Sequence, residues 1–240
     1  MKFFDHKEID DTHFRVLEAY DAFIRSQIPE NYDKPIRMRD WELSQVLYAI
    51  GENKRYSRAL DTGSVNTFLS LWLTQVADQA IASDLLGQRI YKNILRRLRI
   101  LPRKPTEANI ETWLKAIKAK SKVPVKNVDL TQIKFPDDHF DLITSISVVE
   151  HIPRIEAAIA EMYRILAPGG KLLITTDCTP QGKPLERGVR YFTHQELKDL
   201  FSPYPVTSQV RAPDFRRENW CYHKDQPLLT TFIQIEKPAK

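Results

Sequence analysis

Glycine and cysteine are scarce in this chain, which has 7 Gly and 2 Cys among its 240 residues. The two cysteines, Cys178 and Cys221, lie far apart in the sequence, which excludes the dense disulfide framework of a small secreted domain. This usage fits a reducing compartment, and we expect a cytoplasmic protein. The glycine fraction is less than half of the usual value of about 7%, so loops that normally need several glycines must form here with fewer.

Long apolar runs are also absent. No stretch approaches the roughly 18 residues of a membrane-spanning helix. The N-terminus, MKFFDHKEID, turns charged by residue 5 and has no apolar signal segment. With 42% hydrophobic and 28% charged residues, the composition is that of a soluble globular protein, and we expect no membrane span.

The motifs of several enzyme classes are missing as well. The histidines and cysteines do not have the spacing of a zinc site, so we expect no metal. The sequence contains no P-loop, no G-x-S-x-G elbow and no G-x-G-x-x-G fingerprint. These absences argue against P-loop nucleotide hydrolases, serine hydrolases of the elbow type and dinucleotide-dependent dehydrogenases.

Positive charge is present in excess, and it is concentrated in one segment. The net charge is +5, and residues 88–126 hold twelve Lys and Arg against Glu107 and Glu111. Such a stretch can bind phosphates or a membrane surface. Because no aromatic residues alternate with these charges, we interpret 87–122 as a solvated helical insertion and do not favour a nucleic-acid partner.

Hydrophobic periodicity divides the chain into two parts. Residues 1–53 have helical spacing throughout and predict an N-terminal helical cap that ends at Gly51. After residue 58, strands and helices alternate, which is typical of a parallel α/β sheet. We expect strands near 58–61, 79–83, 124–128, 140–146 and 170–176, and helices near 67–76, 86–99, 108–120, 153–166 and 194–201.

Two further strands, near 206–211 and 229–236, have no helix between them and should pair antiparallel. The predicted fold class is therefore α/β. It consists of a doubly wound, mostly parallel seven-stranded sheet with an antiparallel C-terminal hairpin and an N-terminal helical cap. In such a sheet, ligands bind beyond the carboxyl ends of the strands, so the residues that end each strand are the candidates for a site.

One long stretch carries a family resemblance. Residues 135–177 read FPDDHFDLITSISVVEHIPRIEAAIAEMYRILAPGGKLLITTD, with a buried strand, an EH turn, an amphipathic helix and a Pro-Gly-Gly break before the next strand. This order resembles the second half of class I, Rossmann-like methyltransferases that use S-adenosylmethionine. The resemblance covers roughly residues 55–200. It implies a Rossmann-like methyltransferase domain over 54–240, with S-adenosylmethionine as the cofactor.

The loop after the first predicted strand, ALDTGSVNT, departs from the family pattern. The family has an acid followed by several glycines, which let the backbone approach the cofactor. Asp61, Gly63 and Ser64 match this pattern and are implied cofactor-binding residues, whereas Val65 and Thr67 stand where glycines are usual. A β-branched residue cannot adopt a left-handed conformation cheaply, so either the loop follows a different path or cofactor binding is weakened.

Other cofactor contacts are implied at the ends of the following strands. Asp84 ends the second strand, where one carboxylate can accept from both ribose hydroxyls, and Leu85 follows it. Asp129 lies where the family binds the adenine amino group, with Leu130 against the ring; alternatively, Asp129 only caps a turn. Ser145 ends the fourth strand on the edge that faces the methyl group in similar enzymes.

His151 is the candidate catalytic base. It follows the fourth strand, and imidazole titrates near neutral pH, so it can take a proton from an attacking hydroxyl. Alternatively it only shapes the pocket, because methyl transfer depends mainly on positioning. Glu150 could orient the ring or lie on the helix surface. Asp177 ends the fifth strand and, with His223, is a second choice for the base.

The predicted function is S-adenosylmethionine-dependent methylation of a small molecule or a glycan, at oxygen. One alternative is a catalytically silent methyltransferase-like binding protein, which the substitutions at Val65 and Thr67 support. Another is an RNA methyltransferase, which the basic charge favours, although no N-P-P-Y-type tetrapeptide is present. Fold alone does not choose among these functions.

Overall fold

A computed structural model describes most of the chain. The described residues are 1–5, 11–33, 35–36, 39–51, 54–65, 67–87, 110–186, 188–208, 211–220 and 227–239. The basic segment 88–109, Arg37, Cys221 and His223 therefore lie outside the described residues.

Within this part of the chain, seven strands form one mixed sheet in the order β1-β9-β6-β5-β2-β3-β4. The strands are β1 (Lys2–Phe3), β2 (Tyr56–Thr62), β3 (Ala77–Asp84), β4 (Val125–Asn127), β5 (Phe140–Ile146), β6 (Leu166–Cys178) and β9 (Leu229–Glu236). Strands β2 to β6 are parallel, whereas β9 is antiparallel to both β6 and β1. The predicted fold class is confirmed.

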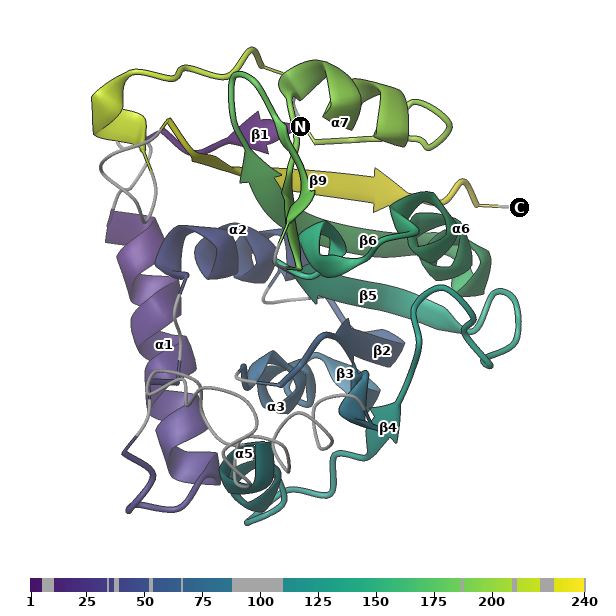
Figure 1. Cartoon of the computed structure of the whole chain (residues 1–240). Helices are drawn as coiled ribbons and strands as arrows, with labels where there is room; N and C mark the ends of the chain where they lie inside the picture. Colours follow the sequence, from purple (N-terminus) through teal and green to yellow (C-terminus); the bar gives the residue numbers. More distant parts are fainter. Residues whose placement is uncertain are drawn as a thin grey trace, which may run out of the picture.

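Helices cover both faces of the sheet, as Figure 1 shows. They are α1 (Asp11–Gln27), α2 (Asp40–Ile50), α3 (Leu69–Leu73), α5 (Ile110–Ile117), α6 (Ile155–Ile165) and α7 (His194–Phe201), with short 3-10 turns η2 (Val149–His151) and η3 (Arg217–Asn219). Strand side chains alternate between two cores: Ala59 and Leu142 pack with α1, α2, α3 and α5, whereas Leu60 and Ile143 pack with α6 and α7. This alternation produces the doubly wound arrangement.

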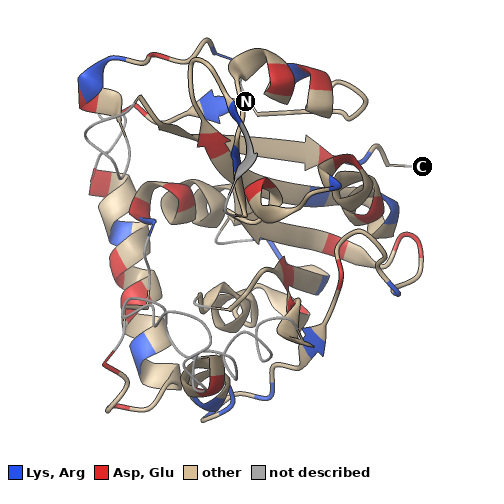
Figure 2. Ribbon diagram, viewed as in Figure 1, with Lys and Arg blue, Asp and Glu red and all other residues tan. Residues whose placement is uncertain are grey.

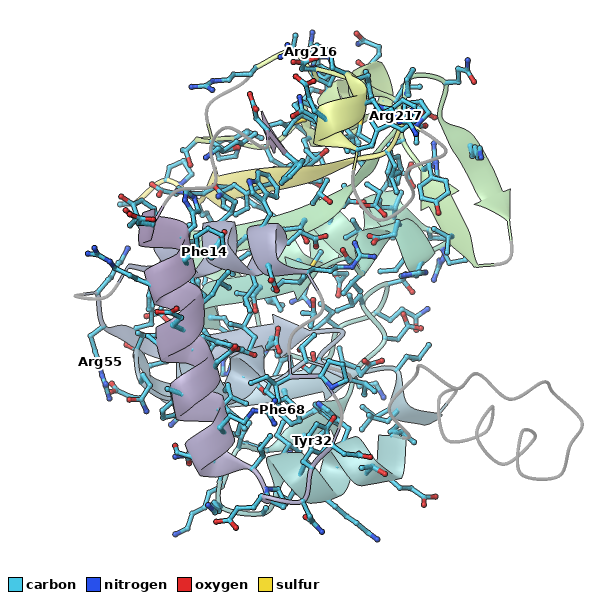
Figure 3. The ribbon with its side chains drawn as sticks, turned by 90° about the vertical axis from the view of Figure 1, so that its left-hand side faces the viewer. Phe14, Tyr32, Arg55, Phe68, Arg216 and Arg217 are labelled. Atoms are coloured by element: carbon cyan, nitrogen blue, oxygen red, sulfur yellow. The ribbon has the colours of Figure 1, made fainter. Side chains whose placement is uncertain are left out.

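The N-terminal helices share the first of these cores. Figure 3 shows Tyr32 beside Phe68, and their ring centroids are 5.3 Å apart in an edge-to-face arrangement. Phe14 lies on the outer side of α1 and remains 55% exposed. The chain between α1 and α2 is thereby attached to the segment that follows β2.

The prediction of helix throughout 1–53 was wrong at the start of the chain. Lys2 and Phe3 pair with Phe232 and Thr231 of β9 and form the edge strand β1. Phe3 is buried in the second core, so the segment is held by packing and by the sheet edge. A strand of two residues is too short to leave a periodic signal in the sequence.

The C-terminal hairpin is shorter than expected. Strand β9 spans the predicted residues 229–236, but the segment near 206–211 is reduced in its described residues to a single antiparallel bridge between Val206 and Ile235. Pro205 precedes Val206 and has no N–H to donate, which limits a strand there. Beyond this bridge, β1 takes the place of a second hairpin strand beside β9.

The sequence did not predict a small hairpin formed by β7 (Lys183–Glu186) and β8 (Val189–Tyr191). Its turn contains Gly188 with φ +83°, a left-handed conformation that suits glycine. The hairpin contacts η2, which ends in the candidate base His151. This hairpin lies between β6 and α7 in the chain, beside the turn that contains His151.

Part of the predicted insertion is described. Trp113 and Ile117 of α5 are fully buried, and the Trp113 indole N–H donates to the Thr67 carbonyl. Residues 88–109 lie outside the description, so the structure of the basic run stays a prediction. Figure 2 shows that the charges of both signs in the described part lie mostly on helices and loops. No helix within the described ranges has the length and apolarity needed to cross a membrane.

Candidate functional site

The carboxyl ends of β2, β3 and β5 lie side by side. Thr62 at the end of β2 is in register with Ser83 of β3 and with Ser145 of β5. The chain proceeds from β2 to β3 in one direction and from β5 to β6 in the other, so the strand order reverses between β2 and β5. This reversal is where an open α/β sheet binds ligands.

The loop after β2 is tightly held. Gly63 has φ +64°, and a Cβ built on it would lie 2.2 Å from Cγ2 of Val148, so both conformation and space require glycine there. The Ser64 hydroxyl donates to the Asp61 carbonyl at 2.7 Å, and the Val65 N–H donates to Oδ2 of Asp84 at 3.0 Å. The one glycine that the loop retains is therefore at the position that needs it.

The two departures from the glycine pattern do not strain this backbone. Among the described non-glycine residues, only Asp138 and Ser147 have positive φ, so Val65 and Thr67 are not left-handed. Val65 is buried in the core shared with α2 and α3. Thr67 donates its N–H and its hydroxyl to the Ser64 carbonyl. The loop follows a path on which β-branched residues are allowed.

Orphaned polar atoms lie at the ends of β2 and β5. Asp61 is buried; its Oδ1 accepts from the Thr144 hydroxyl at 2.9 Å, but Oδ2 has no hydrogen-bond partner. Burial raises the pKa of Asp61 to about 7, although the Thr144 bond opposes the shift. The Ser145 hydroxyl is also buried without a partner. Because buried polar groups are normally hydrogen-bonded, these atoms fit a ligand that supplies donors.

Asp84 lies at the end of β3, as predicted, and its carboxylate already accepts hydrogen bonds from the backbone. Its Oδ1 accepts from the Leu85 N–H at 2.7 Å, and its Oδ2 accepts from Val65, so it joins the ends of β2 and β3. Each carboxylate oxygen has a second lone pair, and the ribose role remains chemically compatible. That role stays a prediction, as does the contact predicted for Leu85.

The structure contains the turn cap that was the alternative interpretation of Asp129. Oδ1 of this exposed residue accepts from the N–H and the hydroxyl of Thr131, and these two bonds lower the pKa of Asp129. Leu130 is 8% exposed and packs in the core beside α6. Both residues lie just after β4, next to Asp84 at the end of β3, so the adenine contact stays a prediction that the placement allows.

His151 and Glu150 point to different surroundings. Nδ1 of the exposed His151 ring lies 2.6 Å from the carbonyl oxygen of Gly188. A carbonyl can only accept, so Nδ1–H donates, and in the neutral ring Nε2 then holds the lone pair. Glu150 is 1% exposed and accepts from the Thr176 hydroxyl at 3.2 Å. Glu150 therefore neither orients the His151 ring nor lies on the helix surface.

Sequence reasoning missed Glu42, which is fully buried in α2. Its Oε2 accepts from the hydroxyls of Ser147 and Thr175, each at 2.7 Å, and its Oε1 accepts from Arg39 at 2.8 Å. The same Arg39 side chain lies 3.6 Å from Asp177 at the end of β6. Ser147 has φ +50°, so the Glu42 bond helps to hold a strained residue directly after β5.

Glu42, Glu150 and Asp177 form a buried cluster where the carboxyl end of β6 meets α2 and η2, and we call this cluster the acidic pocket. Burial is the main reason that the pKa of Glu150 rises to about 8 and that of Asp177 to about 7; the neighbouring carboxylates add to both shifts and Arg39 opposes them. The α2 residues from Trp41 to Leu47 are all buried, and Glu42 is the only charged residue among them.

In the described part of the chain, no group of histidine, cysteine or acidic residues has the arrangement of a metal site. Cys178 is buried, and burial raises its pKa to about 12, which argues against a reactive thiolate. The chemistry of the site therefore rests on carboxylates, hydroxyls, His151 and the backbone of the loop after β2.

Comparison with known proteins agrees with this geometry. Residues 60–174 match the sequence pattern of a methyltransferase domain family. The ubiquinone/menaquinone biosynthesis C-methyltransferase UbiE of Shewanella pealeana is 30% identical over 122 residues, which are 49% of this chain and 48% of that protein. UbiE of Psychromonas ingrahamii is 38% identical over 98 residues, 41% of this chain and 38% of that protein. The chain thus spans about half or less of the length of these curated relatives.

Solved structures share the fold across nearly the whole chain. The N-methyltransferase NodS of Bradyrhizobium japonicum, crystallised with S-adenosyl-L-homocysteine, superposes with a TM-score of 0.56 at 17% identity and covers 95% of this chain and 100% of its own. The segment 60–174, which matches the methyltransferase domain family, includes the loop after β2 and the FD, EH and PGG segments on which the resemblance depends. The chain therefore contains a methyltransferase domain over residues 60–174 and shares the fold of class I, S-adenosylmethionine-dependent methyltransferases.

Proposed function

We propose that this protein transfers a methyl group from S-adenosylmethionine to a small-molecule acceptor at the carboxyl edge of β2 and β5. The observation that supports this most directly is a pair of buried oxygen atoms without hydrogen-bond partners, Asp61 Oδ2 and Ser145 Oγ. They lie beside a loop whose conformation requires a glycine at position 63. When bound, the cofactor supplies an electrophilic methyl group on a sulfonium cation. A cation at this edge would be stabilised by the buried carboxylates around it.

The residues proposed to hold the cofactor are those predicted from the sequence: Asp61, Gly63, Ser64, Asp84, Leu85, Asp129, Leu130 and Ser145. Each lies at or just after the carboxyl end of β2, β3, β4 or β5. Their main task is to position and desolvate the reacting groups, because an in-line displacement depends on alignment more than on proton transfer. A cytoplasmic location and a division into a cap over 1–53 and a catalytic domain over 54–240 remain part of the proposal.

The predicted ribose contact can be tested at Asp84. We expect Asp84→Ala to weaken binding of S-adenosylhomocysteine by about 1–3 kcal/mol in calorimetry, the scale for stranding a polar partner in a buried site. Asp78→Asn is the matched control, since Asp78 is an exposed acid at the other end of the same strand, paired with Arg55. Unchanged affinity in Asp84→Ala would remove the ribose assignment.

The acceptor atom predicted from the sequence is oxygen, on a small molecule or a glycan, and a hydroxyl acceptor needs a base. For such an acceptor we expect His151→Ala to lower turnover by roughly 10²–10⁴-fold while cofactor affinity hardly changes. His139→Ala serves as the control, because His139 lies before the amino end of β5, away from the carboxyl edge. If His151→Ala keeps most of its turnover, His151 serves only the contact with Gly188.

The alternative of a catalytically silent binding protein depended on Val65 and Thr67. The relaxed backbone at these positions no longer favours it. S-adenosylhomocysteine that fails to bind the whole chain in calorimetry would restore that alternative and overturn the proposed function. An RNA acceptor has no support among the described residues, since the basic run on which it depended lies outside them.

A further inference from the structure

The acidic pocket contains more acceptor atoms than the protein satisfies. Oε1 of Glu150 has no hydrogen-bond partner, and Oδ1 of Asp177 has only the longer ion pair with Arg39 at 3.6 Å, although these residues are only 1% and 4% exposed. A third buried orphan, the Thr231 hydroxyl, lies on β9 directly opposite Thr176, whose own hydroxyl donates to Glu150. Directly opposed residues project to the same face of a sheet, so Thr231 and Thr176 share the face on which Glu150 packs.

The charge of the pocket is also unbalanced. Among the described ion pairs, three buried carboxyl groups face the guanidinium of Arg39, which is 30% exposed and lies closest to Glu42. The groups whose charge acts on Glu150 are Asp177 on β6 and both Arg39 and Glu42 at the start of α2. Burial favours the neutral form of these carboxyl groups, and a cation bound beside them would favour the charged form, so the pocket suits a ligand that brings positive charge.

The missing partner must therefore donate hydrogen bonds and carry positive charge. An ammonium group has three donors and no acceptor, which matches a set of orphans dominated by carboxylate oxygens. A hydroxyl would satisfy one orphan but leave the charge unbalanced. A phosphate or a carboxylate would be repelled.

We propose that the acidic pocket binds an ammonium group of the methyl acceptor, so that the acceptor atom is a basic nitrogen. This inference rests on the proposed function. The position of the pocket favours the acceptor over the amino group of the cofactor itself as the source of the ammonium. β6 is separated by β5 and β2 from β3 and β4, whose ends hold Asp84 and Asp129.

Proton transfer follows from the same arrangement. An ammonium has no lone pair, so it must lose a proton before its nitrogen can react, and Glu150 is the group proposed to take it. The nitrogen then forms a bond to the methyl carbon as the carbon–sulfur bond breaks, and the electron pair of that bond stays on sulfur. A bound ammonium favours the ionised carboxylate of Glu150, which can accept the proton, and burial, which raises the pKa of Glu150, stabilises the protonated form that results.

The test compares amines with alcohols of the same shape, in the full chain and without turnover. Ethylamine and benzylamine are titrated against ethanol and benzyl alcohol, and binding is followed by the amide NMR signals of Ser147, Thr176 and Asp177. We expect at least one amine to bind about 10–100-fold more tightly than its alcohol, the scale of one or two charge-assisted hydrogen bonds. If neither amine is preferred, the inference is wrong.

Amino-acid substitutions then test whether the preference for amines over alcohols arises in the acidic pocket. Glu150→Gln and Asp177→Asn should each reduce the preference at least 10-fold, and Thr231→Val, which only removes a hydroxyl, should reduce it less. Glu156→Gln is the matched control, since Glu156 is an exposed glutamate in the first turn of α6. If Glu150→Gln does not fold, Asp177→Asn and Thr231→Val provide the same test. Equal preference in these variants and in the control would overturn the assignment.

A final titration distinguishes an ammonium group of the acceptor from the amino group of the cofactor. It also distinguishes failure of this inference from failure of the proposed function. With saturating S-adenosylhomocysteine, the amine should still bind, because the acceptor site is expected to be separate from that of the cofactor. Loss of amine binding under these conditions would assign the pocket to the amino group of the cofactor and overturn the inference about the acceptor. If S-adenosylhomocysteine itself does not bind, the proposed function fails, whereas S-adenosylhomocysteine binding without amine preference contradicts the inference alone.

Discussion

Replacing Gly63 with alanine is expected to lower the free energy of unfolding by about 2–4 kcal/mol and to abolish measurable binding of S-adenosylhomocysteine. A left-handed conformation costs an ordinary residue roughly 1–2 kcal/mol, and Gly63 has φ +64°. The added Cβ would also lie 2.2 Å from Cγ2 of Val148, and forced overpacking costs about 1–3 kcal/mol. Val148 leads into η2, so relief of the clash would displace Glu150 and His151. Denaturant unfolding and calorimetry measure the two effects.

Two further variants separate the causes of this loss. Gly169→Ala also replaces a glycine of positive φ, at +75°, but no atom lies within 4 Å of its built Cβ. Its cost should therefore be the conformational part alone. Val148→Ala in the Gly63→Ala background removes both Cγ atoms and leaves only Cβ, at 3.3 Å, so it should recover the clash part. A Gly63→Ala protein that is no less stable than Gly169→Ala would contradict the steric argument.

Glu42→Ala is expected to destabilise the protein by about 3–5 kcal/mol, the range for breaking a buried charged network from one side. The substitution would remove the acceptor of three buried or half-buried hydroxyls, on Ser147, Thr175 and Thr230, and the closest partner of Arg39. These bonds attach α2 to the carboxyl ends of β5 and β6. We therefore expect α2 to loosen first, which amide hydrogen exchange can detect as faster exchange in Asp40–Ile50 than in β5.

Two controls accompany this measurement. Glu18→Ala removes an exposed glutamate from α1 and should change stability by less than about 0.5 kcal/mol. Glu42→Gln keeps the shape and one acceptor oxygen, so its loss should be smaller than that of Glu42→Ala. An alanine variant that loses no more than the Glu18 control would show that the network contributes little to the fold.

The placement of the elements shows which parts of the structure are local properties of the sequence. The strand at 140–146, the helix at 194–201 and the strand at 229–236 have the boundaries that their residue patterns predict. In the helix, the boundary is fixed by a capping box in which Thr193 and Glu196 bond reciprocally to each other's backbone. Alternation and capping are interactions between near neighbours in the chain, so they can be recognised from the order of residues.

Other features depend on segments that are distant in the sequence. Lys2 and Phe3 form a strand only because the edge of β9 is available more than 200 residues later. The conformation of Val65 is set by its hydrogen bond to Asp84 and by its burial under the helices. For this reason the sequence alone could not show that the loop accommodates a β-branched residue at position 65.

The acidic pocket is the clearest case of a feature that only the tertiary structure decided. Asp177 could be selected from the sequence because it ends a strand, and the cofactor residues could be placed at strand ends by resemblance and topology. Nothing in the order of residues indicated that Glu42 and Glu150 would be buried beside it. Burial and pKa depend on which groups pack around a side chain in space, and here those groups come from α2, β6, β9 and η2. The sequence therefore determined the fold and the edge at which the site lies, whereas long-range packing determined its charge.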